Sequence, residues 1–91
     1  MIQNKDFIQI CFKNLKQINT LDILIFQTSK KDRAIKVQKI LDERFNVFEE
    51  GFFCKEFLDL DDKELKKILK QLQKIEFPRS NQLWFKIVKN K

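Results

Sequence analysis

The 91-residue sequence contains no histidine and no tyrosine. The absence of histidine removes the commonest general base and the commonest metal-binding side chain. Gly51 is the only glycine, so the chain cannot form a glycine-rich loop around phosphates. Catalysis would have to rely on carboxylates, lysine, serine, threonine or cysteine. The composition therefore favours binding or scaffolding over catalysis, and no cofactor is expected.

Long apolar runs are also missing. No stretch approaches the roughly 18 apolar residues that cross a membrane, and the first six residues lack the basic and apolar segments of a secretory signal. We therefore expect a soluble, cytoplasmic protein. Cys11 and Cys54 are far apart in the sequence, which favours buried free thiols over a metal site or a disulfide.

The remaining composition is that of one small folded domain. Hydrophobic residues make up 43% of the sequence and charged residues 35%, and there are ten phenylalanines. Such a chain can bury enough apolar area to offset its conformational entropy. Its short length leaves a small core, so we expect a homodimer or association with a larger assembly.

The formal net charge of +6 is unevenly distributed. Residues 1–45 carry +4, residues 46–64 carry −5 and residues 65–91 carry +7. A basic C-terminal third is typical of a protein that binds a polyanion. A lysine-rich, solvated helix face would give the same pattern.

The apolar spacing predicts two elements at the start of the chain. Residues 5–17 favour a helix capped by Asn4, although alternating apolar residues in the same segment would also suit a strand. Residues 21–26 form a short β-branched run that is typical of a central strand.

Further along, residues 31–44 carry an apolar stripe that predicts a helix. Residues 46–58 predict one strand bent near Gly51, or two short strands. Residues 62–75 predict a second helix behind a capping pair of Asp61 and Glu64, and residues 83–88 a final strand. We therefore expect an α+β fold: a ferredoxin-like β-α-β-β-α-β domain over 21–91, with an extension over 1–20.

Three stretches of this pattern resemble a known family. They are the strand and turn over 23–29, the segment 32–53, and the helix over 62–75 with the strand over 84–88. In order and spacing they are similar to the CRISPR adaptation small subunit, Cas two, and to the related virulence-associated protein D family. The resemblance implies a homodimer that holds duplex DNA between larger integrase subunits.

The sequence departs from that family at one important position. The strand-end Asp that holds a divalent metal in the family's nucleases falls on Gln27, and a neutral amide is a poor substitute as a ligand for Mg²⁺. The chain also ends without the strand that many members pass to their partner, and residues 1–20 have no counterpart. A relative with these features is expected to bind no metal.

The first hypothesis is accordingly a non-catalytic nucleic-acid-binding or scaffolding subunit. Its basic side chains would neutralise phosphates of duplex DNA or RNA in a salt-dependent manner. The candidates are Lys30, Lys31, Arg33, Lys66, Lys67, Lys70, Lys74, Arg79, Lys86 and Lys89.

Two alternatives remain open. A nuclease or toxin would depend on the carboxylates Asp22, Asp32, Glu49 and Glu50, but the last two are strand neighbours and point to opposite faces. A structural subunit of a protein or ribonucleoprotein assembly would use surplus aromatic residues as a contact. Those aromatics are Phe48, Phe52, Phe53, Phe57, Trp84 and Phe85, most of which we expect in the core.

Overall fold

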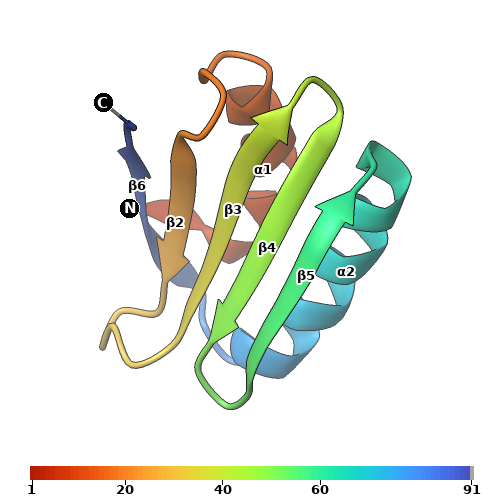
Figure 1. Ribbon diagram of the computed structural model, residues 1–91. Coiled ribbons are helices and arrows are strands. Elements are labelled where there is room, and N and C mark those ends of the chain that lie inside the picture. The colour runs from red at the N-terminus through yellow and green to blue at the C-terminus, as the bar shows by residue number, and fades with distance from the viewer. Residues whose placement is uncertain (91) are drawn as a thin grey trace.

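The computed structural model describes residues 1–90 and contains six strands and two α-helices (Figure 1). The elements are β1 (Ile2–Gln3), a single 3-10 turn η1 (Asn4–Asp6), α1 (Phe7–Leu15), β2 (Ile23–Gln27), β3 (Ala34–Leu41), β4 (Arg44–Glu50), β5 (Cys54–Leu60), α2 (Asp62–Glu76) and β6 (Gln82–Val88). The α+β class predicted from the sequence is confirmed.

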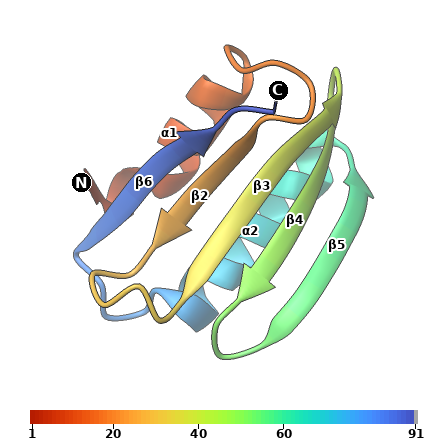
Figure 2. The same ribbon diagram turned by 60° about the vertical axis from the view of Figure 1, so that its left-hand side comes forward.

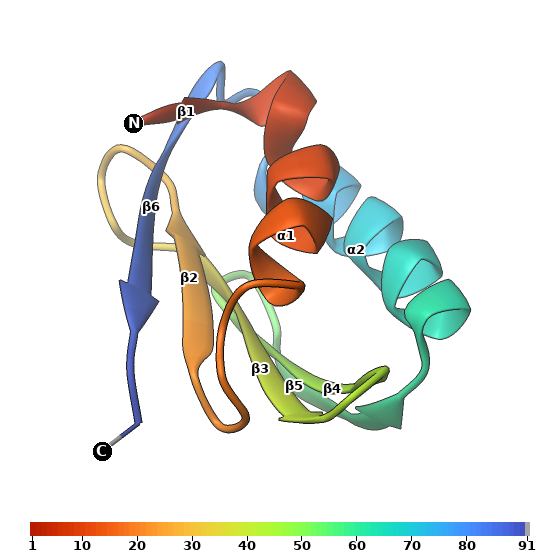
Figure 3. The same cartoon turned by 90° about the horizontal axis from the view of Figure 1, so that it is seen from above.

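All six strands belong to one antiparallel sheet in the order β1-β6-β2-β3-β4-β5. Strands β2 to β5 follow one another as a meander. The chain then forms α2, and β6 after it pairs with β2 (Figure 2). Both helices lie on the same side of the sheet (Figure 3). On the opposite side, called here the open face, no helix of residues 1–90 covers the sheet.

The core lies between the sheet and the two helices. Alternate residues of the central strands point into it, such as Leu24 and Phe26 of β2, which pair with Val37 and Ile35 of β3. From α1 the ring of Phe7 meets the Phe26 ring edge-on, with centroids 4.7 Å apart. Fully burying one such side chain stabilises the fold by about 1.5–3 kcal/mol. Residues 1–18 therefore contribute to the same core as the rest of the chain.

The predicted second helix is confirmed as α2. Asp61 accepts a hydrogen bond from the backbone of Glu64, and Glu64 accepts one in return from the backbone of Asp61. This capping box satisfies donors that the first turn of a helix leaves free. Leu65, Leu69 and Leu72 follow at helical spacing and are buried.

The helix predicted over 31–44 is wrong, because this segment forms the strand β3. Its residues also alternate: Ile35 and Val37 are fully buried, while the Lys36 side chain is one-third exposed. β3 pairs with β2 on one side and β4 on the other along nearly its whole length. The backbone pairing with these two strands decides the conformation of the segment, although the spacing of its apolar residues also suits a helix. After the short β1, the order is therefore helix, four strands, helix and strand, rather than β-α-β-β-α-β.

Three other expectations have mixed outcomes. The N-terminal helix is confirmed as α1, but Asn4 does not cap it with its side chain. The region 46–58 forms two strands joined by a turn at 51–53. Cys11 is buried as expected, whereas Cys54 is exposed on β5, and both are free thiols. No helix within residues 1–90 is long and apolar enough to cross a membrane.

Candidate nucleic-acid interface

Three connections converge at one end of the sheet, which we call the loop end. They are the β2–β3 loop at 28–33, the β4–β5 turn at 51–53 and the α2–β6 connection at 77–81. The loops lie together at the bottom of the view in Figure 1, beside the C-terminal end of α2. The loop end therefore combines segments that are far apart in the sequence.

Glu76, the last residue of α2, holds the loop end together from inside. Its side chain is fully buried. Its carboxylate accepts hydrogen bonds from the backbone nitrogens of Phe52 (2.8 Å) and Phe53 (3.2 Å), and the Arg33 guanidinium Nε lies 3.9 Å away. A side chain at Gly51 would collide with this carboxylate. The single glycine is thus required by the close approach of Glu76.

Glu49 of β4 lies beside Glu76 and is also buried, at 2% exposure. Within residues 1–90 its Oε2 atom has no hydrogen-bonding partner. Burial raises the pKa of Glu49 to about 7, and the neighbouring Glu76 carboxyl adds to the shift while Lys55 opposes it. The fold therefore favours a protonated Glu49, which has a hydrogen to share with a neighbouring oxygen.

Three aromatic rings are exposed at the loop end. Phe52 is 66% exposed, and Phe53 and Trp84 are each 42% exposed. Trp84 lies at the start of β6, and its indole nitrogen donates to the Ser29 carbonyl oxygen at 3.3 Å. Of the six aromatic residues considered as a contact surface, only Phe57 and Phe85 pack against the core cluster, so the expectation that most of them are core is wrong.

A cation lies over each of these rings. The Lys31 ammonium is 5.3 Å from the Trp84 ring centroid, and the Lys55 ammonium is 5.0 Å from that of Phe53. The Arg33 guanidinium carbon is 5.6 Å from the centroid of the Phe52 ring. These separations fall within the range of cation–π attraction. The arrangement presents flat apolar faces beside positive charge.

A basic pocket of about 540 Å³ opens between the β2–β3 loop and the α2–β6 connection. Its lining includes Thr28, Ser29, Lys30, Arg33, Arg79 and Ser80. Two acidic residues, Asp32 and Glu76, also line it. The Asp32 carboxylate accepts a hydrogen bond from the Thr28 hydroxyl at 2.7 Å, which lowers the pKa of Asp32. Three cations and two serine hydroxyls thus face a space large enough for a phosphate group.

The ten basic residues predicted as contacts do not share one surface. Lys30, Lys31, Arg33 and Arg79 gather at the loop end, and Lys74 lies in the last turn of α2 that leads to it. Lys66, Lys67 and Lys70 are exposed on α2, away from the sheet, and Lys86 is on the open face. Lys89 follows β6 at the far end of the sheet.

The four carboxylates considered for a nuclease are dispersed. Asp22 precedes β2 at the far end, where backbone hydrogen bonds from Asn90 (2.9 Å) and Asn19 (3.0 Å) lower its pKa. Glu49 faces the core and Glu50 faces the other way, pairing with Lys36 at 2.9 Å. Their opposite orientation is confirmed. Across residues 1–90 no three acidic or cysteine side chains form a group that could hold a metal ion.

No protein-family model, curated protein or solved structure matches this chain. The resemblance to the Cas two family stays a prediction. The strand at 34–41 differs from the helix that the resemblance implied there.

Proposed function

We propose that this domain binds single-stranded nucleic acid through its loop end. The observation that carries the proposal is the placement of three exposed rings, Phe52, Phe53 and Trp84, at the same end of the sheet as the basic pocket, each with a cation over it. Proteins that bind single strands combine a positive groove for the backbone with aromatic side chains for the bases.

The chemistry of the loop end favours unpaired bases over the duplex that the family resemblance implied. The bases of a duplex are stacked on one another, so exposed rings gain little from meeting them. An unpaired base can stack on a ring, and each such contact is worth about 1–3 kcal/mol. Phosphates would lie against Lys30 and Arg79, which gives a salt-dependent affinity.

Two matched triple variants test the location of the site. Lys30→Gln/Lys31→Gln/Arg79→Gln removes charge at the loop end, and Lys66→Gln/Lys67→Gln/Lys70→Gln removes the same charge from α2. Each lowers the formal net charge from +6 to +3. Fluorescence anisotropy with a labelled single-stranded oligonucleotide measures the affinity at several salt concentrations.

We expect the loop-end variant to lose about tenfold or more in affinity. We also expect the slope of log affinity against log salt to become shallower by about two, since each lost phosphate contact on a single strand contributes about 0.7. The α2 variant should keep most of the affinity. Equal losses in both variants would show that only net charge matters and would refute a site at the loop end.

The second candidate function is assembly with another copy of the chain. Strand β5 is one of the two edge strands of the sheet, and its Leu58 is 57% exposed. An antiparallel pairing of two β5 strands centred on Phe57 places Lys55 opposite the Asp59 of the second copy. Sedimentation equilibrium should then show a dimer that Lys55→Asp dissociates. A monomer at all concentrations would contradict this self-assembly.

A further inference from the structure

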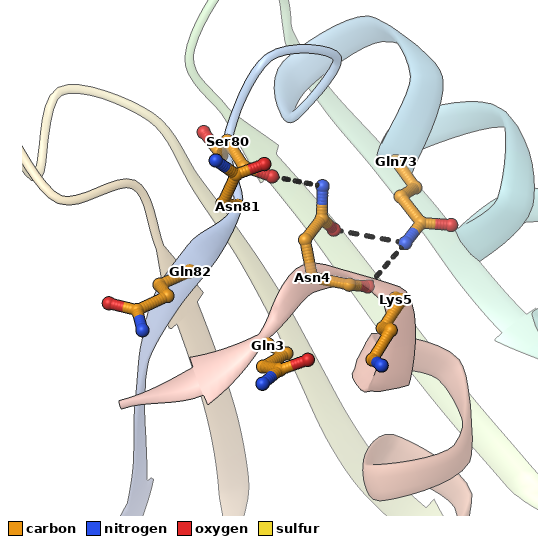
Figure 4. Close-up of a pocket in the computed structure, with 7 residues that line it drawn as sticks. All are labelled: Gln3, Asn4, Lys5, Gln73, Ser80, Asn81 and Gln82. Atoms are coloured by element: carbon orange, nitrogen blue, oxygen red, sulfur yellow. Dashed lines mark hydrogen bonds between the residues drawn. The ribbon is translucent and has the colours of Figure 1, made fainter.

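A second pocket lies next to the basic pocket and has a different chemistry (Figure 4). It has a volume of about 510 Å³ and lies between β1, the last turns of α2 and the start of β6. Apart from Lys5 and Ser80, every lining side chain is a carboxamide: Gln3, Asn4, Gln73, Asn81 and Gln82. We call it the amide pocket.

Two of the five carboxamides hold the pocket in shape. Asn4 Nδ2 donates to the carbonyl oxygens of Phe77 and Ser80, each at 2.8 Å. Gln73 Nε2 donates to the backbone oxygen of Asn4 (2.8 Å) and to its side-chain oxygen (3.0 Å). These bonds fasten the N-terminal segment to α2 and to the α2–β6 connection.

Two of the other carboxamides, Gln3 and Gln82, are open to a ligand. Gln3 and Gln82 are paired residues of β1 and β6, and both side chains are exposed. In Figure 4 no hydrogen bond joins either of them to another residue of the pocket. Each offers a donor and an acceptor side by side.

The amide pocket adjoins the basic pocket. Ser80 lines both, and a third hollow of about 440 Å³ shares Arg79 with the basic pocket and Gln82 with the amide pocket. Phosphates held at Arg79 and Lys30 would therefore leave an adjoining base close to the carboxamides. A nucleotide has this combination of an anionic part and a neutral polar edge.

We propose that the amide pocket reads a nucleobase, with adenine as its preferred base. A carboxamide matches the adjacent donor and acceptor on the edge of adenine in a bidentate manner. This inference rests on the proposed binding of single strands. Phosphate contacts and ring stacking alone would bind any sequence, and the amide pocket would make this binding selective for a base.

The test compares the wild-type chain with Gln3→Met/Gln82→Met, which keeps side-chain length but removes the amides. A matched control, Gln17→Met/Gln71→Met, changes two exposed glutamines outside the pocket. Affinities are measured by anisotropy for oligo-dA, oligo-dC, oligo-dT and an abasic oligonucleotide of equal length. Circular dichroism checks the fold, and Gln82→Met alone replaces the double variant if that variant unfolds.

We expect the wild-type chain and the control to bind oligo-dA about tenfold more tightly than the other bases. In the pocket variant this preference should disappear, while affinity for the abasic strand stays unchanged. Equal affinity for all bases, or a preference that survives in the variant, would overturn the base pocket but leave the proposed function standing. A preference for another base that the variant loses would overturn the assignment to adenine. No binding to any oligonucleotide would overturn both.

Discussion

The substitution Glu49→Gln removes an ionisable group from the interior of the loop end. Glu49 is almost fully buried, and its Oε2 atom has no hydrogen-bonding partner within residues 1–90. Glutamine has nearly the same shape, and its amide can donate to the Glu76 carboxylate without titrating. We therefore expect the variant to fold and to be more stable than the wild-type chain at neutral and basic pH.

The size of the effect follows from the pKa of Glu49. Burial and the nearby Glu76 raise it from 4.5 to about 7 in the folded chain. Between these values the folded state binds more protons than the unfolded state, so stability falls as pH rises and levels off above about pH 7. From pH 5 to pH 8 the wild-type chain should lose about 2–3 kcal/mol that the variant keeps.

Urea unfolding at several pH values between about 5 and 8 measures this difference. Glu50→Gln is the matched control, because Glu50 is the next residue, is half exposed and faces away from the core. Its stability relative to the wild-type chain should change little over the same range. A stability difference for Glu49→Gln that is constant with pH would refute the raised pKa.

Three further substitutions test the packing around the site by urea unfolding. Asp61→Ala removes the cap of α2 and should cost about 1 kcal/mol, and a variant as stable as the wild-type chain would contradict the capping box. Leu69→Ala leaves a cavity under α2 and should cost about 2–5 kcal/mol, whereas a cost typical of a surface position would contradict its burial. Gly51→Ala should lower the stability by about 1–3 kcal/mol, since the new Cβ would meet the Glu76 carboxylate. An unchanged stability would mean that Glu76 does not hold the turn at 51–53.

The parts of the fold that the sequence predicts are those whose signals are local. In α2, the capping pair and the leucine spacing lie within one segment and agree with each other. In β3, Ala34, Val37 and Leu41 suit one face of a helix, while Ile35 and Val37 suit one face of a strand. Pairing with β2 and β4 decides between the two, and those partners lie outside the segment.

The candidate site was predictable only in part for the same reason. Its cations are visible in the sequence, but their distribution over several surfaces follows from the order of the strands. Phe52 and Phe53 look like core residues until the β4–β5 turn places them outside. The amide pocket joins Asn4 to Gln73, two residues whose proximity depends on tertiary structure. No local pattern indicates that contact.

Trp84 provides the most direct measurement of single-strand binding at the loop end, because it is the only tryptophan in the sequence. Its fluorescence is recorded while a single-stranded oligonucleotide is added at low salt, with anisotropy of the labelled strand as the independent report of binding. We expect quenching that saturates with the anisotropy and is reversed by salt, since bases would stack on the indole. Binding seen by anisotropy with no change in Trp84 emission, or no binding at all, would contradict a site at the loop end.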